Sequence, residues 1–302
     1  MRQPSSPLPL IALMGPTASG KSAMAVDLAK KFNGVIISAD SRQVYRGMTV
    51  ATAKISKVQM QGVRHYMIDV VSPDDEFNVA LFQQKVYAIL RRIAKHNETA
   101  KKPVIPFLVG GTGLYVRAIT DDYRLSVARP DQKLRDALET MPLAKLAQRL
   151  LRLDRDTRVD LRNRRRVIRA IEKHEASESP ASSTARPPIR TLKLGIEVPL
   201  PILEQRIAQR IAGLSIPKLV RETKSLTRRY DLSSNPMTAL YYRLVQDYID
   251  GKVSLDQLQE RLARMDRQYA KRQLTWLKKE PNLHWITSSR EAANLIRNFL
   301  VQ

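Results

Sequence analysis

Apolar runs alternate with amphipathic stretches over the first third of the chain. Runs at 8–14, 34–39 and 103–109 are bounded by polar residues and have the length of buried strands, and 66–71 is a shorter candidate. Residues 80–95 carry apolar side chains at the spacing of an amphipathic helix. Strands that alternate with helices in this way predict an α/β protein with a doubly wound parallel sheet.

The pattern changes in the middle of the chain. Between residues 145 and 175 it is helical and basic, with eleven Lys and Arg against five Asp and Glu. Residues 176–188 are rich in Ser, Ala and Pro and predict a loop. An apolar run at 191–200 then predicts a return to the sheet, so we expect the helical block to be an insertion.

The last third of the chain is mostly helical, from 201 to 279, with a short strand expected at 284–287. No internal repeat is visible. We therefore expect a core made of residues 1–126 together with 191–302, which contains the phosphate-binding loop (P-loop) described next. A helical insertion at 127–190 interrupts this core.

The P-loop is a glycine-rich segment between the first expected strand and the first expected helix. Its sequence, GPTASGKS, matches G-x-x-x-x-G-K-S/T, and the flanking strand and helix give the context that this motif requires. Its main-chain N–H groups can surround an oxyanion at the positive end of the helix dipole. We expect it to bind a di- or triphosphate, with Lys21 as a mobile charge and Ser22 on Mg²⁺. The loop comprises Gly15, Pro16, Thr17, Ala18, Ser19, Gly20, Lys21 and Ser22.

Two further polar loops follow expected strands. Asp40 and Ser41 come after the run at 34–39, and the GGTG segment Gly110–Gly113 comes after the run at 103–109. Ligands of doubly wound sheets bind at the carboxyl ends of the strands. We therefore expect these two loops and the P-loop to converge on one crevice.

Asp40 is the candidate for chemistry in that crevice. At the end of a buried strand it can accept a proton or hold Mg²⁺, although an Asp in this place can also cap a helix. Its neighbours Ser41, Arg42, Gln43 and Tyr45 can hydrogen-bond the edge of a base or stack on it.

The net charge of the chain is unusually high and positive. Its 302 residues include 52 Lys and Arg against 29 Asp and Glu, a formal net charge of +23. Such an excess favours a polyanionic partner, because neutralising backbone phosphates releases counterions. The chain has no cysteine, which excludes disulfides and thiolate chemistry, and its four His are scattered. No apolar run is long enough to span a membrane and no signal peptide is evident, so we expect a cytoplasmic protein.

One basic helix within the run RNRRRVIRAIEK is the candidate for contact with a polyanion. Its arginines at 162, 165, 166 and 169 fall near one face, and its apolar residues pack elsewhere. A solvated helix face is the alternative to a surface that contacts backbone phosphates, which we favour.

Six blocks of the chain, in order, resemble those of the tRNA dimethylallyltransferases, also called tRNA isopentenyltransferases. They are GPTASGKS, DSRQVYRGM, Thr52-Ala53-Lys54, GGTGLY, RRVIRAIE and RQYAKRQLTW. The first is shared with many P-loop proteins, whereas DSRQVY, GGTGLY and AKRQLTW together are highly specific. The resemblance spans nearly the whole chain. It implies the transfer of a dimethylallyl group from dimethylallyl diphosphate to N6 of adenine 37, beside the anticodon of certain tRNAs.

The resemblance also implies roles for individual residues. Asp40 would take a proton from the exocyclic amine, Thr112 would bond near the same centre, and Lys21 with Mg²⁺ on Ser22 would stabilise the pyrophosphate leaving group. The adenine would leave its stack and be held by its edge. The implied partners are tRNA, through its anticodon loop, and dimethylallyl diphosphate, and we expect a monomer that binds no membrane. The residues implied to contact tRNA are Asp40, Ser41, Arg42, Gln43, Thr112, Arg135, Arg165, Arg166, Val167, Ile168 and Arg169.

The chain departs from the family pattern at several positions. Thr238 stands where the family usually has an Arg thought to hold the diphosphate, and Tyr241 stands where it has a Gly; Arg221 and Arg243 are candidate replacements. These departures keep open a catalytically weakened RNA-binding paralogue, and the P-loop alone keeps open a kinase of a small substrate. The net charge disfavours a relative that prenylates free AMP. Common Glu, Asp and Gly residues are likewise replaced at Val35, Thr49 and Ala51.

Overall fold

The chain forms two compact units. The computed structural model describes residues 7–121, 123, 125, 131–175, 185–232, 234, 236–238 and 241–301. Met1–Tyr123 and Arg186–Gln302 make up one unit, which we name the sheet unit, and Arg124–Ala185 makes up the insertion unit. These boundaries lie three residues before the expected 126 and five before the expected 190. Most of the loop expected at 176–188 lies outside the described residues.

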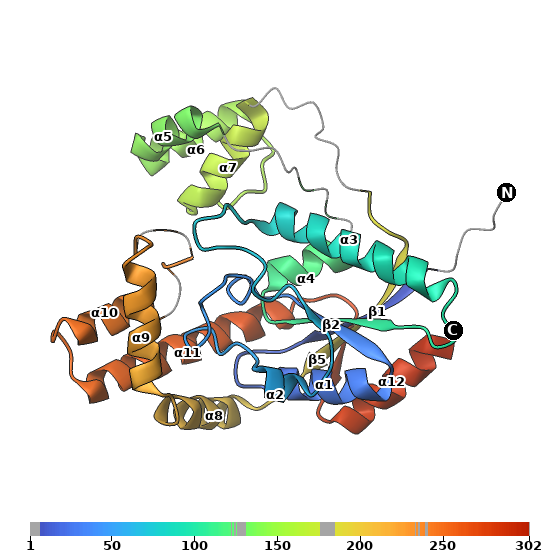
Figure 1. The fold of residues 1–302 in the computed structure, drawn as a ribbon. Helices are drawn as coiled ribbons and strands as arrows, with labels where there is room; N and C mark the ends of the chain where they lie inside the picture. The colour runs from blue at the N-terminus through green and yellow to red at the C-terminus, as the bar shows by residue number, and fades with distance from the viewer. Residues whose placement is uncertain are drawn as a thin grey trace. The chain divides into compact units, whose positions relative to one another are not determined.

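A six-stranded parallel sheet in the order β3-β2-β4-β1-β5-β6 organises the sheet unit (Figure 1). From β1, inside the sheet, the chain runs to the β3 edge, returns as β4 between β2 and β1, and then crosses to β5 and the β6 edge. This confirms the predicted doubly wound fold. Residues 191–196 of the run expected at 191–200 lie in this sheet, as part of β5, whereas Leu200 already begins helix α8. The strands are β1 (Leu8–Met14), β2 (Gly34–Ser38), β3 (His65–Tyr66), β4 (Ile105–Gly110), β5 (Ile189–Ile196) and β6 (Leu283–Ile286).

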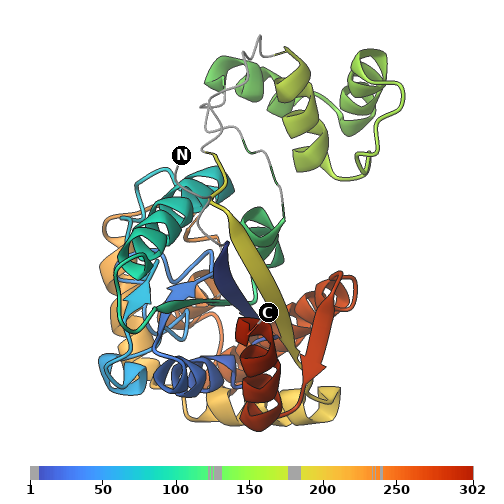
Figure 2. The same cartoon turned by 90° about the vertical axis from the view of Figure 1, so that its right-hand side faces the viewer.

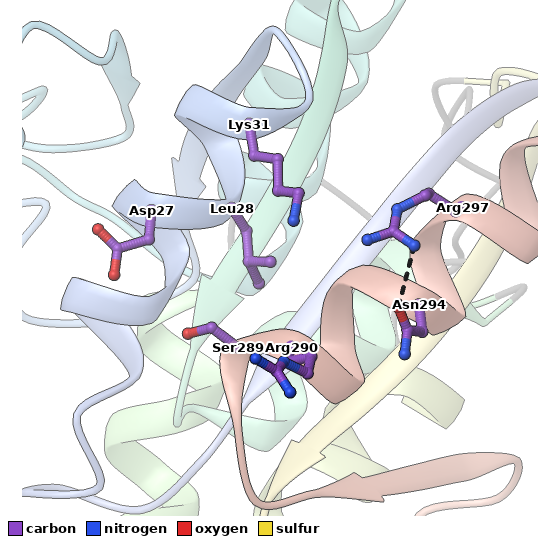
Figure 3. Close-up of a pocket in the computed structure, with 7 residues that line it drawn as sticks. All are labelled: Asp27, Leu28, Lys31, Ser289, Arg290, Asn294 and Arg297. Carbon is purple, nitrogen blue, oxygen red and sulfur yellow. Dashed lines mark hydrogen bonds between the residues drawn. The ribbon is translucent and has the colours of Figure 1, made fainter.

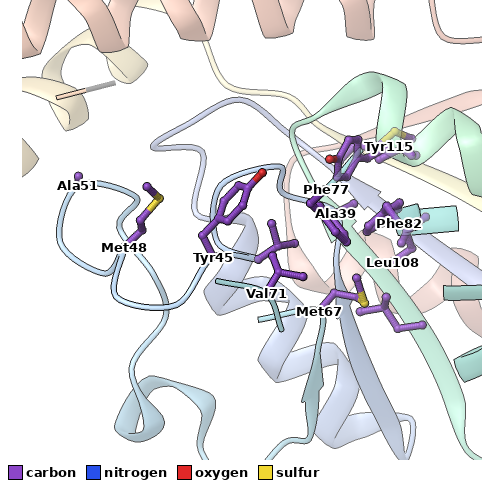
Figure 4. Close-up of a cluster of buried hydrophobic side chains, with 14 of the residues drawn as sticks. Ala39, Tyr45, Met48, Ala51, Met67, Val71, Phe77, Phe82, Leu108 and Tyr115 are labelled. Carbon is purple, nitrogen blue, oxygen red and sulfur yellow. The ribbon is translucent and has the colours of Figure 1, made fainter. Parts of the chain in front are cut away.

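The strand expected at 66–71 is wrong beyond its first residue. Met67 and Asp69 have left-handed backbones, with φ of 63° and 53°, which interrupt the extended chain. Val71 lies outside the named strands and forms an isolated β-bridge with Tyr45. The prediction rested on the apolar side chains of this segment. These side chains pack in the core without forming a strand, as Met67 and Val71 show (Figure 4).

Helices cover both faces of the sheet (Figures 1 and 2). Alternate side chains of β1 enter two different buried clusters, because successive residues of a strand point to opposite faces. One cluster contains residues of α1 and α12, and the other contains residues of α3, α4 and α11. The helices of this unit are α1 (Lys21–Lys31), α2 (Lys57–Met60), α3 (Val79–Asn97), α4 (Gly113–Thr120), α8 (Leu200–Ala212), α9 (Ile216–Thr227), α10 (Tyr242–Ile249), α11 (Leu255–Leu277) and α12 (Ser289–Val301).

The insertion unit has its own small core. Its helices are α5 (Gln132–Thr140), α6 (Leu143–Leu153) and α7 (Arg164–Glu175), and α7 packs against both of the others. Helices of this length are marginal alone, so their apolar faces must be buried together. None of the helices described in either unit is long and apolar enough to cross a membrane. The buried side chains of this core are Leu138, Leu146, Leu150, Val167, Ile168 and Ile171.

Candidate active site

The P-loop connects β1 to α1, as the sequence predicts. Gly20, the residue before α1, has a left-handed backbone with φ of 87°, which glycine adopts without steric cost. Among the residues that the structure describes, no side chain caps the first turn of α1, and that turn contains no acidic residue. The amide groups at this end of the helix are therefore available to an anionic ligand.

Lys21 folds back over the loop. Its Nζ donates a hydrogen bond to the carbonyl oxygen of Pro16 at 3.2 Å. Burial lowers the pKa of the Lys21 ammonium, the charge of Asp40 opposes this shift, and the charge of Arg210 adds to it. A phosphate group beside Lys21 would offset the cost of burying the ammonium.

Gln273 of α11 joins the P-loop to the GGTG loop. The main-chain N–H of Thr17 donates to its Oε1 at 2.7 Å, and its Nε2 donates to the carbonyl oxygen of Gly111 at 3.1 Å. A Cβ at Gly111 would lie 2.2 Å from that Nε2, so any larger residue there would displace the Gln273 side chain. Gln273 was not among the predicted site residues. Its signal was its place in the RQYAKRQLTW block, whose other residues drew no assignment.

Asp40 follows β2 and organises the next loop. Its Oδ1 accepts hydrogen bonds from the main-chain N–H groups of Arg42, at 2.8 Å, and Gln43, at 3.2 Å. The N–H of Ser41 donates to the Thr112 hydroxyl at 3.3 Å. Residues 41–44 form a turn and not a helix, so the helix cap considered for Asp40 is wrong. Asp40 caps this turn instead, and the two bonds fix the direction of the carboxylate that lines the pocket.

A pocket of about 770 Å³ brings the P-loop and the Asp40 loop together. Gly15, Pro16, Ser19 and Thr112 do not line it, although Thr112 bonds to the loop that does. Tyr269 of α11 also lines it, and burial and the Asp40 charge raise the pKa of its hydroxyl. The predicted site residues that line it are Thr17, Ala18, Gly20, Lys21, Ser22, Asp40, Ser41, Arg42 and Gln43.

Tyr45 does not face this pocket, so the expectation that it stacks on a base is wrong. Its side chain is 3% exposed and packs edge-on against Phe77, with ring centroids 6.4 Å apart (Figure 4). The residues of the DSRQVYRGM block thus divide between two tasks. Asp40 to Gln43 line the pocket, and the apolar residues from Val44 onward build the core.

The donor set suits a magnesium ion that arrives with a phosphate ligand. The Ser22 hydroxyl and the Asp40 carboxylate line the same hollow, and Mg²⁺ prefers such oxygen ligands. Among the described residues, no group of three or more His, Cys, Asp or Glu could hold a metal. The residues therefore fit an ion whose remaining ligands are phosphate oxygens and water.

The predicted contact residues of the insertion unit fall into three groups, which are exposed, paired with a carboxylate, or buried. Arg165 and Arg166 are exposed, as a phosphate-contacting surface requires. Arg135 and Arg169 both bind the Glu172 carboxylate, the first through two hydrogen bonds of 2.6 and 3.0 Å and the second at 3.0 Å. The side chains of Val167 and Ile168 are buried in the core of the unit, so their assignment as tRNA-contacting side chains is wrong.

The departures at Thr238 and Tyr241 lie at the same pocket, which both residues line. Neither candidate replacement does so, because Arg221 on α9 and Arg243 on α10 are exposed and do not line it. Arginines at other positions line the pocket instead. They are Arg42, Arg210 and Arg272, of which Arg210 is paired with the buried Asp266 carboxylate, to which the Tyr241 hydroxyl also donates at 2.7 Å.

A second hollow, of about 450 Å³, lies between α1 and α12 (Figure 3). Charged side chains of both helices line it, among them Asp27, Lys31 and Arg290. It contains none of the residues that the motifs identify, so the predicted site belongs to the larger pocket.

Fold and pocket together define a P-loop α/β protein in which the carboxylate of Asp40 lines the same pocket as the P-loop. The chain belongs to the IPP transferase family, whose sequence model matches residues 43–280. This confirms the resemblance found in the six sequence blocks.

Individual relatives match over nearly their whole length. The chain is 36% identical to a tRNA dimethylallyltransferase of Carboxydothermus hydrogenoformans, over 97% of this chain and 96% of the relative. It is also 36% identical to one of Roseiflexus sp., over 97% and 99%. Both names describe a prenyl-transferring enzyme, and neither supports the kinase alternative.

Solved structures share the fold. The tRNA isopentenylpyrophosphate transferase of Bacillus halodurans is similar with a TM-score of 0.70 and 35% identity, covering 97% of this chain and 95% of that one. A eukaryotic dimethylallyltransferase acting on tRNA is similar with a TM-score of 0.80, covering 97% and 80%. At 23% identity, this second likeness concerns the fold alone.

Proposed function

We propose that this protein transfers a dimethylallyl group from dimethylallyl diphosphate to N6 of adenine 37 in tRNA. The names of its relatives support this reaction. The observation that carries it for this chain is the pocket shared by Lys21 and Ser22 of the P-loop and Asp40 of the neighbouring loop. Prenyl transfer to an amine needs an anion site for the leaving group and an acceptor for the amine proton, which the P-loop and Asp40 would supply.

The P-loop side of the pocket would hold the diphosphate. The bond between C1 of the allylic group and the diphosphate oxygen breaks, and its electron pair leaves with pyrophosphate. The uncapped amides at the start of α1 and the Lys21 ammonium stabilise the growing negative charge. Mg²⁺, held by Ser22 and the diphosphate, would neutralise further charge when bound.

The Asp40 side of the pocket would hold the adenine. The N6 nitrogen forms the new bond to C1 and gives up one proton, which passes to the Asp40 carboxylate. The amides of Arg42 and Gln43 hold Oδ1, so the carboxylate cannot turn away from the pocket without losing two hydrogen bonds. The base itself must leave its stack to enter.

The insertion unit would bind the backbone of the tRNA. The exposed Arg165 and Arg166 and the net charge of +23 support this part of the proposal. Phosphate contacts of this kind position the nucleic acid and carry no information on sequence. The cytoplasmic location and the monomeric state remain predictions.

The test is nucleoside mass spectrometry of tRNA after incubation with the full chain, dimethylallyl diphosphate and Mg²⁺. We expect a gain of one dimethylallyl group on adenosine 37. A parallel reaction with AMP should give no product. Tight binding of tRNA without any transfer would establish the non-catalytic paralogue instead.

A further inference from the structure

Glu222 on α9 makes four hydrogen bonds with one short stretch of chain and one hydroxyl. Its Oε2 accepts from the main-chain N–H groups of Thr49, at 2.9 Å, and Val50, at 2.6 Å. Its Oε1 accepts from the N–H of Ala51, at 3.1 Å, and from the Tyr242 hydroxyl, at 2.9 Å. The carboxylate thus holds three consecutive amides of a turn from a helix more than 170 residues later in the chain.

The turn that Glu222 holds continues into a wall of the active-site pocket. Ala51, Thr52 and Ala53 line the pocket together with Gln43. The Gln43 side chain donates its Nε2 to the carbonyl oxygen of Thr52 at 3.3 Å. Glu222 is therefore connected to a side chain beside Asp40 through its hydrogen bonds to residues 49–51, the main chain from Ala51 to Thr52, and the hydrogen bond of Gln43.

The P-loop is fixed by different contacts. It is held by Gln273 through Thr17 and by its own lysine on Pro16, and neither contact involves the turn. The turn and the P-loop can therefore be disturbed separately.

We propose that Glu222 is a positioning residue that sets the nucleobase side of the pocket and leaves the diphosphate side unaffected. The inference rests on the proposed function, in which Gln43 lies on the adenine side. Because Glu222 binds main-chain amides, the unusual side chains at Thr49 and Ala51 do not disturb its contacts. A carboxylate that accepts several amide hydrogen bonds fixes a loop more firmly than neutral acceptors do.

The test compares substitutions that remove different numbers of these bonds. Glu222→Ala removes all four. Glu222→Gln keeps one oxygen for two amides but presents an NH₂ group to the others, and Tyr242→Phe removes one bond only. Glu204→Ala is the matched control, because Glu204 on α8 is a partly exposed acid that pairs with Lys271 at 3.5 Å and does not line the pocket.

We expect the KM for tRNA to rise about tenfold in Glu222→Ala, by less in Glu222→Gln, and by less than about twofold in Tyr242→Phe. The KM for dimethylallyl diphosphate should stay within about twofold in all of them. The control should behave as wild type. A general loss of folding would instead change both KM values or kcat in Glu222→Gln as well, and that result would overturn the proposal.

Amide hydrogen exchange provides a readout that does not need activity. The amides of Thr49, Val50 and Ala51 should be protected in the wild type and exchange faster in Glu222→Ala, with the amides of β1 and β4 unchanged. Unchanged exchange at the three amides would overturn the proposal even in an active enzyme. If the wild type transfers no prenyl group at all, the proposed function fails. The positioning role of Glu222 is then tested by this exchange and by the Kd for tRNA.

Discussion

The sheet unit and the insertion unit hold their charged side chains in different ways. In the sheet unit, main-chain groups fix the polar residues of the site: two amides hold Asp40, and Gln273 is bonded to an amide and a carbonyl of two loops. In the insertion unit, Arg135 and Arg169 are paired with Glu172, and Arg165 and Arg166 are exposed. Bond-making chemistry needs a fixed direction, which the main chain provides, whereas contact with backbone phosphate needs mainly charge.

This comparison predicts that substitutions in the two units will affect different quantities. Changes in the sheet unit should lower the rate of transfer, and changes in the insertion unit should lower the affinity for tRNA.

Asp40→Asn should lower the rate of transfer by about 10²–10⁴. The amide oxygen of Asn can still accept from the amides of Arg42 and Gln43, so the loop keeps its shape while the proton acceptor is lost. Single-turnover kinetics with radiolabelled dimethylallyl diphosphate would measure the rate, and a filter-binding assay would show tRNA affinity within a few-fold of wild type. Transfer at the wild-type rate would exclude Asp40 as the base.

Gln273→Met should lower kcat/KM by roughly ten- to a hundredfold, because the amide of Thr17 and the carbonyl of Gly111 both lose their partner. Methionine has a similar volume, so the packing of α11 is preserved. Steady-state kinetics would test this, with Gln268→Met as control, since Gln268 lies on the same helix and at the same pocket but is exposed. Equal effects of the two substitutions would contradict a specific role for Gln273.

Arg165→Ala combined with Arg166→Ala should weaken tRNA binding by several-fold, and by a similar factor for every tRNA tested. Each phosphate contact that is lost should reduce the slope of log K against log salt by about 0.9. Titrations at several salt concentrations would measure this, with Lys95→Ala on α3 as the control for loss of surface charge. An unchanged slope would mean that these arginines form a solvated helix face only.

The free energy of unfolding of the insertion unit should fall in acid. The fall should be on the order of 1 kcal/mol and not larger, because Arg135 and Arg169 are about one-third exposed and water screens their pairing with Glu172. Burial would raise the pKa of Glu172, but its hydrogen bonds to Arg135 and Arg169 outweigh burial and hold the pKa below its ordinary value of 4.5. The charged form therefore stabilises the fold above that value, and the contribution is lost as the pH falls through the lowered pKa. Thermal unfolding from pH 7 to pH 3 should show this dependence, and Glu172→Gln should reduce it.

Much of the fold and the centre of the site were predictable from local signals. The alternation of apolar runs gave the parallel sheet, and the P-loop and Asp40 were found because their residue types sit at the ends of strands. The left-handed residues Met67 and Asp69 were not predictable, because neither is a glycine or lies in a turn motif.

Contacts between distant segments were also beyond local signals. The bonds of Gln273 and Glu222 join segments more than 150 residues apart, and no periodicity records such partners. Motif blocks led us to assign binding roles to Tyr45, Val167 and Ile168, whose side chains are buried. Within one block, some residues face a ligand and others face the core. Only the fold separates the two faces.

The most direct test of the division between the two units is single-turnover transfer with enzyme in excess, at saturating tRNA and dimethylallyl diphosphate. Under these conditions weak binding no longer limits the rate. We predict that the enzyme carrying Arg165→Ala and Arg166→Ala transfers the prenyl group at nearly the wild-type rate, while Asp40→Asn remains slower by about 10²–10⁴. An arginine variant as slow at saturation as Asp40→Asn would contradict the account, because the insertion unit would then take part in the chemical step.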